Sequence, residues 1–164
     1  MKSEESCEIL NLATLDWEPM PPLPGSSVFY SVISHEGDIF VMGGMIPPSQ
    51  FSKKVWRFRM ADQCWESARD MLCTRTDFAA GFIASRIIVT GGVGLGPTKD
   101  PMGRSETEAM TANKRKWEKL PNMIKPRLSV TVACWENNMA VIGGLGKGGP
   151  TNVVEVLTIE EGDN

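Results

Sequence analysis

The sequence predicts an all-β protein built from a repeated four-stranded unit, and three observations lead to this fold class. Tryptophans recur at Trp17, Trp65 and Trp117, which are 48 and 52 residues apart. Glycine doublets recur with the same two spacings, and each doublet begins 26 residues after its tryptophan. Between these markers lie short runs rich in Val, Ile and Phe, bounded by turn residues, which is typical of strands. The doublets are Gly43-Gly44, Gly91-Gly92 and Gly143-Gly144.

Each unit contains four expected strands in a fixed order. The first two are apolar runs separated by a polar turn, and the second run ends at the glycine doublet. These turns are EGD at 36–38, SR at 85–86 and ENN at 136–138. The third strand is CEIL at 7–10, VWRF at 55–58, TEAM at 107–110 and VEVL at 154–157. The fourth strand carries the tryptophan, and four strands in a repeat of about 50 residues indicate a blade of a β-propeller.

The order of the strands predicts the organisation of the domain, which covers residues 7–158. It begins with the third and fourth strands of a preceding blade (7–19), continues with repeats one (20–67) and two (68–119), and ends with repeat three (120–158), which lacks its last strand. Residues 1–6 and 159–164 are expected to be flexible tails. Because propellers ordinarily have about 4–8 blades, the chain is either a partial propeller or half of a six-bladed ring. In the second case two chains pair head to tail, and each Trp17 strand completes the last blade of its partner.

These markers resemble those of the kelch repeat. The shared features are the doublet after an apolar strand, a third strand of Val-Glu-Val type, the tryptophan 26 residues before a doublet, and Met-x-x-x-Arg between them. Met71–Arg75 and Met123–Arg127 match the last pattern, whereas Ser27 stands at the arginine position of repeat one. The chain further resembles the C-terminal half of small stand-alone kelch domain-containing proteins. The resemblance implies kelch-type β-propeller blades.

The glycine-rich stretch at 86–98, RIIVTGGVGLGPT, has two interpretations. A strand followed by glycines can hold a phosphate, but that site also needs a helix N-terminus or a G-K-S/T motif. Neither is expected after this stretch. The doublets are instead expected to adopt positive φ and to let neighbouring backbone approach closely. This second interpretation explains why a doublet stands at the same place in all three units.

Composition and charge argue against several classes of function. The net charge of -3 gives no reason to expect binding to nucleic acid or to a membrane surface. No apolar run approaches the roughly 20 residues that span a bilayer, and the polar N-terminus is unlike a signal peptide, so a cytoplasmic location is expected. His35 is the only histidine and is expected to be an exposed turn residue. The four cysteines form no C-x-x-C pair and are expected to be core thiols, so we expect no metal, no cofactor and no catalysis.

The remaining function is that of a non-catalytic protein–protein interaction module or scaffold, with partners bound by loops on one propeller face. The resemblance implies partner contacts near the Met-x-x-x-Arg position, with acidic or phosphorylated segments as partners. Arg75 and Arg127 match that position, and Asp77 and Ser129 follow two residues later. A structural bond to a neighbouring blade or loop carbonyl is the other role open to both arginines. The alternative function is a sugar-processing, mutarotase-type propeller enzyme. The loops that vary most are 23–27, 71–75 and 123–127 before the first strands, and 45–53, 93–104 and 145–151 after the doublets.

Overall fold

The computed structural model describes residues 7–96, 100–111 and 116–160. The predicted tail at 1–6, and residues 161–164 of the tail predicted at 159–164, therefore lie outside the described residues. Ile159, which was predicted to begin the C-terminal tail, is buried, and its N–H donates to the Asn137 carbonyl at 2.9 Å. Every regular element in the described residues is a strand, so the all-β prediction is confirmed. None of these residues belongs to a helix that could cross a membrane.

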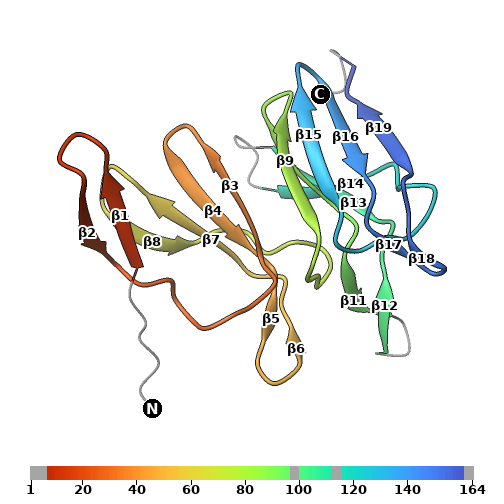
Figure 1. Cartoon of the computed structure of the whole chain (residues 1–164), viewed down its shortest axis with the longest axis horizontal. Helices are drawn as coiled ribbons and strands as arrows, with labels where there is room; N and C mark the ends of the chain where they lie inside the picture. Colours follow the sequence, from red (N-terminus) through yellow and green to blue (C-terminus); the bar gives the residue numbers. More distant parts are fainter. Residues whose placement is uncertain (1–6, 97–99, 112–115, 161–164) are drawn as a thin grey trace.

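Three sheets form the blades, and a two-stranded sheet precedes them (Figure 1). The half blade contains β1 (Cys7–Asn11) and β2 (Asp16–Met20). The first blade contains β3 (Ser31–His35), β4 (Asp38–Met42), β7 (Val55–Arg59) and β8 (Cys64–Ser67) in that order. The second blade contains β9 (Ala79–Ile83), β10 (Arg86–Thr90), β13 (Thr107–Thr111) and β14 (Lys116–Leu120). The third blade has three strands, β15 (Thr131–Trp135), β16 (Asn138–Ile142) and β19 (Val154–Thr158).

A small hairpin follows each glycine doublet, and the three hairpins lie at the same end of the blades (Figure 1). In each blade one isolated bridge joins this hairpin to the segment that enters the first strand. The bridges are Val28 to Met45, Thr76 to Val93 and Leu128 to Leu145. We call this end, made of the hairpins and the entering segments, the hairpin face. The hairpins are β5 (Met45–Ile46) with β6 (Gln50–Phe51), β11 (Val93–Leu95) with β12 (Pro101–Gly103), and β17 (Leu145–Gly146) with β18 (Gly149–Pro150).

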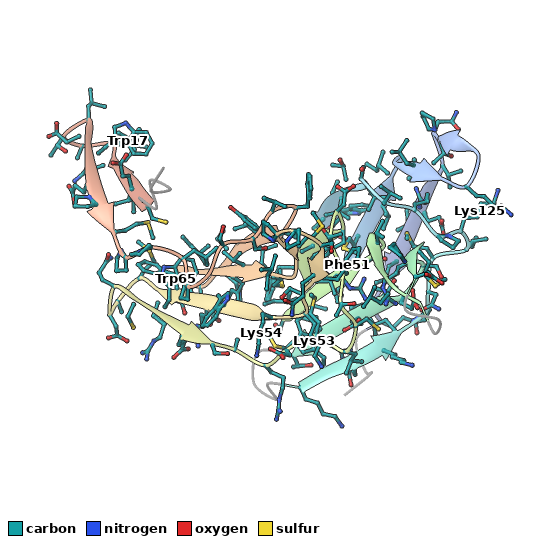
Figure 2. All side chains as sticks on the ribbon, turned by 90° about the horizontal axis from the view of Figure 1, so that it is seen from below. Trp17, Phe51, Lys53, Lys54, Trp65 and Lys125 are labelled. Carbon is teal, nitrogen blue, oxygen red and sulfur yellow. The ribbon has the colours of Figure 1, made fainter. Side chains whose placement is uncertain are left out.

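The tryptophans of the fourth strands bond each blade to the segment that enters it. The indole Nε1 of Trp65 donates to the Pro21 carbonyl at 2.8 Å, and that of Trp117 donates to the Arg69 carbonyl at 2.8 Å. Trp117 is only 2% exposed because it packs in the hydrophobic seam between the first and second blades. Trp17 is 63% exposed and lies on the outlying half blade in Figure 2. The repeated tryptophan is therefore buried in a seam between blades only where another blade precedes its own.

Candidate protein-interaction face

Arg75 and Arg127 lie beneath the hairpin face with their guanidinium groups buried. Their residues are 0% and 1% exposed. Arg75 Nη1 donates to the carbonyls of Gly91 at 3.0 Å and Glu106 at 3.1 Å. Arg127 Nη1 makes the equivalent bonds to Gly143 at 2.7 Å and Val153 at 2.9 Å. Each arginine therefore ties the segment that enters its blade to the end of the second strand.

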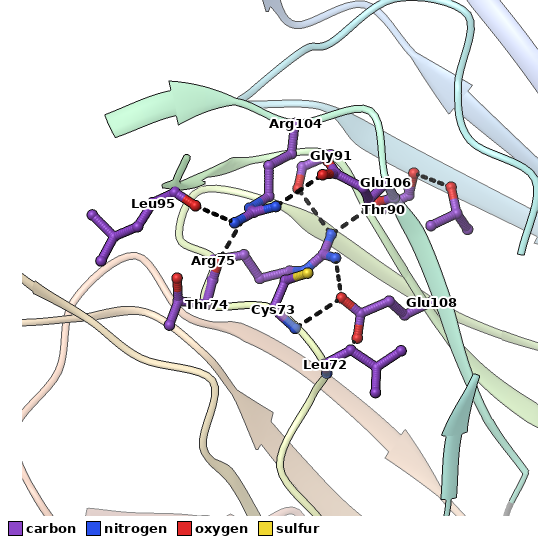
Figure 3. Close-up of polar contacts among 11 residues, drawn as sticks. Leu72, Cys73, Thr74, Arg75, Thr90, Gly91, Leu95, Arg104, Glu106 and Glu108 are labelled. Atoms are coloured by element: carbon purple, nitrogen blue, oxygen red, sulfur yellow. Dashed lines mark hydrogen bonds and ion pairs between the residues drawn. The ribbon is translucent and has the colours of Figure 1, made fainter. Parts of the chain in front are cut away.

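A glutamate completes each arginine site, and of the two Glu108 is buried and Glu155 is half-buried. Arg75 Nη2 pairs with Glu108 Oε1 (Figure 3), and Arg127 Nη2 pairs with Glu155 Oε1 at 2.9 Å. Glu108 also accepts the N–H of Leu72 at 2.7 Å, which holds the entering segment in place. Burying a charged group costs less when it is paired and hydrogen-bonded, as the Nη groups of both arginines are here, whereas the buried Nε atoms of both have no hydrogen-bond partner among the described residues. This geometry matches the structural role that the sequence left open, because the Nη groups point into the protein rather than toward solvent.

The first blade lacks this pair. Ser27 stands at the arginine position, and its hydroxyl donates to the Gly43 carbonyl at 3.4 Å. Trp56 stands at the glutamate position of the third strand. Blade one therefore holds its entering segment without a buried charge.

Asp77 and Ser129, predicted to line one region, are brought together by the structure. Ser129 Oγ donates to Asp77 Oδ2 at 2.7 Å, and Ser129 N–H donates to the Asp77 carbonyl at 2.9 Å. Asp77 N–H donates in the same way to the Phe29 carbonyl at 3.0 Å. Ser129 and Phe29 are exposed and Asp77 is half-buried. These three residues form a row at the inner edge of the blades, and Phe29 was missed although it holds the same place in repeat one.

Arg104 is a third structural arginine, and the sequence did not single it out. Its Nε donates to the Thr74 carbonyl at 3.1 Å, and its Nη2 donates to the Leu95 carbonyl at 2.8 Å. Its Nη1 pairs with Glu106 Oε1 at 3.0 Å (Figure 3). The side chain therefore fills the space between the β11–β12 hairpin and the segment that enters the second blade. No repeat signal could have revealed it, because the other units have no arginine at this place.

The sequence predicted the wrong surroundings for the histidine and for the cysteines. His35 ends strand β3, and its ring stacks on Phe82 of the second blade with centroids 3.7 Å apart. All four cysteines are free, and each is half-buried or exposed rather than part of the core. Partial burial, with Glu108 next in effect, raises the pKa of the Cys73 thiol, while Arg104 and Arg75 oppose the rise. Among the described residues, no group of three His, Cys, Asp or Glu side chains could hold a metal.

Comparisons with known proteins point to one repeat family. The Kelch motif matches residues 27–72, which include the first glycine doublet and the Trp65 strand. The chain contains a Kelch motif and is similar to Kelch domain-containing proteins along nearly its whole length. Kelch domain-containing protein 8B of Homo sapiens is 29% identical over 166 residues, which cover 94% of this chain and 46% of that protein. Kelch-like protein 41b of Danio rerio is 25% identical over 168 residues, covering 98% of this chain and 27% of that protein.

A solved structure confirms the fold independently of the sequence. The protein in "Structure of YjhT" superposes with a TM-score of 0.82 over 96% of this chain and 50% of its own. The two sequences are only 14% identical, so the likeness concerns the fold alone. The chain spans about half the length of the Kelch domain-containing relatives that it matches.

Proposed function

We propose that this chain is a non-catalytic protein-interaction module whose partners bind the hairpin face. The observation that carries the proposal is a constant frame beneath variable loops. The second glycine of each of the first two doublets donates its N–H to the next blade, from Gly44 to Arg75 at 2.9 Å and from Gly92 to Arg127 at 2.8 Å. Loops that vary on a rigid repeated frame are where proteins usually place recognition. Kelch repeat proteins are generally interaction scaffolds, which supports the same role.

The buried arginines support this face from beneath, and its exposed residues contact the partner. Arg75 and Arg127 hold the entering segments through their bonds to Gly91 and Gly143. Ser129 is exposed, and its hydroxyl oxygen, which donates its hydrogen to Asp77, accepts a hydrogen bond from a partner. A buried charge that has its partners inside the protein contributes shape to such a surface more than it contributes direct contacts.

Partner capture tests this function, with substitutions placed at one or the other end of the blades. We expect Gln50→Arg combined with Lys147→Glu, both at exposed hairpin positions, to reduce cross-linked partner recovery several-fold. Glu36→Lys combined with Glu136→Lys, in the turns at the other end, is the matched control and should leave recovery unchanged. Surface substitutions of this kind should leave folding nearly unchanged. Recovery that falls only with the turn variant would contradict the proposal.

Self-association is a second candidate, favoured by the free face of the third blade. Trp135, Ile142, Val154 and Val156 are all exposed there. The matching positions of the second blade, such as Ile83, are buried against the third. In the described residues the Gly144 N–H donates no hydrogen bond, although Gly44 and Gly92 do. An apolar sheet face with an unpaired edge is a site for another chain, and a second copy would continue the same seam.

The pairing of β1 with β2 limits how two chains can form a closed six-bladed ring. The sequence did not reveal this limit. Strand β1 pairs with β2 from Cys7–Met20 to Asn11–Asp16, and β1 and β19 hold the same third-strand position. Strand β2 can therefore complete the partner's third blade only if it leaves β1, or if the β1–β2 hairpin displaces β19. A ring of two chains has one surplus third strand at each junction.

Light scattering on the purified chain measures this association. We expect a species of twice the 18.0 kDa chain mass, and Val156→Lys should shift it toward monomer because it places a charge on the free face. Ile124→Lys is the matched control, since Ile124 is 85% exposed away from that face. A compact and stable monomer of the unchanged protein would overturn this candidate.

A further inference from the structure

One repeat position decides whether the hairpin face is filled or open. Ser52, Arg104 and Thr151 are equivalent, because each N–H donates to the second doublet glycine of its own blade, at 2.9, 2.8 and 3.0 Å. In the second blade the long Arg104 side chain reaches the Thr74 and Leu95 carbonyls. Thr151 is too short to make the equivalent contacts in the third blade.

The third blade consequently has an open groove where the second blade has an arginine. The groove has a volume of about 780 Å³ and lies between β12, the segment that enters the third blade, and the β17–β18 hairpin. A Cβ atom on Gly94 would lie 2.2 Å from the Thr74 carbonyl, whereas one on Gly146 would lie 3.8 Å from that of Pro126. The β17–β18 hairpin thus stands further from its entering segment. In the described residues the Pro126 carbonyl accepts no hydrogen bond and remains available.

The chemistry of this third-blade groove differs from that of the other large groove. Met102, Leu128 and Leu145 supply apolar walls, and Lys125 and Lys147 are exposed at its edge. Figure 2 shows Lys125 projecting outward at this end of the molecule. Among the described residues no carboxylate lines the groove, and neither lysine forms an ion pair.

The groove between the first and second blades differs from the third-blade groove in the charges that line it. Acidic side chains balance the basic ones in its lining, which is made by Lys53, Lys54, Arg57 and Arg69 together with Glu36, Asp38, Glu66 and Asp70. Arg57 pairs with Asp38 and Glu66, and Lys54 pairs with Asp70 at 3.3 Å. The whole chain has a net charge of -3. The third-blade groove is therefore a local concentration of unmatched positive charge on a protein that is negative overall.

We propose that the third-blade groove binds an extended acidic segment of a partner protein. An apolar side chain of the segment lies against Met102 and Leu145, its carboxylates face Lys125 and Lys147, and a backbone N–H donates to the Pro126 carbonyl. Exposed ion pairs add little affinity but select the charge of the partner, while apolar burial supplies most of the binding. The inference rests on the proposed interaction function and names the segment that one part of the hairpin face takes.

Binding of three defined peptide pools tests the inference. Each pool is nine residues long with one central Leu, Ile or Met, flanked by Asp and Glu, by Lys and Arg, or by Ser and Gly. We expect fluorescence anisotropy to show about tenfold tighter binding of the acidic pool than of the Ser and Gly pool. Thr151→Arg should abolish that binding by filling the groove as Arg104 does, and Lys125→Glu with Lys147→Glu should reverse the charge preference. Thr151→Ser and Lys119→Glu are the matched controls and should leave binding unchanged.

Each other outcome overturns a stated part of the inference. Acidic peptides that bind equally well to Thr151→Arg would place the binding site elsewhere on the face and leave the proposed function intact. Equal binding of all pools, or preference for the basic pool, would overturn the acidic chemistry. Absence of binding by every pool would overturn the groove as a peptide site, while partner capture by the hairpin-face variants judges the wider function separately. Unfolding curves of the variants confirm that each is folded.

Discussion

Replacing Arg75 by alanine is expected to lower the free energy of unfolding by about 3–5 kcal/mol, because it leaves Glu108 buried without its cation. Glu108 is only 2% exposed and would keep only the N–H groups of Leu72 and Cys73 as partners. The carbonyls of Gly91 and Glu106 would also lose a donor. Urea unfolding followed by tryptophan fluorescence measures the loss.

The surface ion pair of Lys54 with Asp70 is the control for that substitution. Lys54 is more than half exposed and its Nζ lies 3.3 Å from the carboxylate. Lys54→Ala should therefore cost about 0–1 kcal/mol. Arg75→Met combined with Glu108→Leu should recover part of the loss, because removing both charges of a buried pair costs less than removing one. An Arg75→Ala protein as stable as Lys54→Ala would contradict the structural role of the arginine.

Replacing Gly92 by alanine is expected to destabilise the protein more than the same change at Gly25. The two glycines have nearly the same φ, +90° and +89°, so the backbone strain on alanine is about 1–2 kcal/mol at both. At Gly25 the new Cβ would meet nothing within 4 Å. At Gly92 it would lie 2.5 Å from the Thr76 carbonyl and 2.7 Å from Phe78 Cβ, which adds about 1–3 kcal/mol of overpacking.

The difference between these two variants isolates the close approach of blades from the turn itself. Gly92 cannot move aside easily, because its N–H is bonded to the Arg127 carbonyl at 2.8 Å. Thermal unfolding of both variants against the unchanged protein gives the two losses. Equal losses would mean that the doublet serves only the turn and that no backbone contact depends on it.

The sequence predicted the parts of the fold that recur and missed those that occur once. The spacing of the tryptophans and glycine doublets was sufficient to place the four strands of a blade, because each marker has one physical task at one place. Arg104 occupies a repeat position with no other arginine, so nothing in the spacing distinguished it from a surface residue. The pairing of His35 with Phe82 also depends on the packing of two blades, 47 residues apart in sequence.

The role of Arg75 shows why a repeat position does not by itself give a function. The same side chain at the same place could point toward a partner or back into the blade. Its direction is set by Glu108, which is 33 residues away, and by two backbone carbonyls that no sequence pattern marks. Glu108 lies at the same third-strand position as Glu155, but its bond to the arginine became evident only in the folded blade.

Hydrogen–deuterium exchange of the chain, alone and with a captured partner, tests most directly whether recognition lies on the hairpin face. Backbone amides that a partner covers exchange more slowly, and this readout does not depend on any substitution. We expect slower exchange in the β5–β6, β11–β12 or β17–β18 hairpins and in the segments that enter the blades. The turns at 36–37, 84–85 and 136–137, at the other end of the blades, should be unaffected. Slower exchange confined to those turns would contradict the hairpin face as the binding surface.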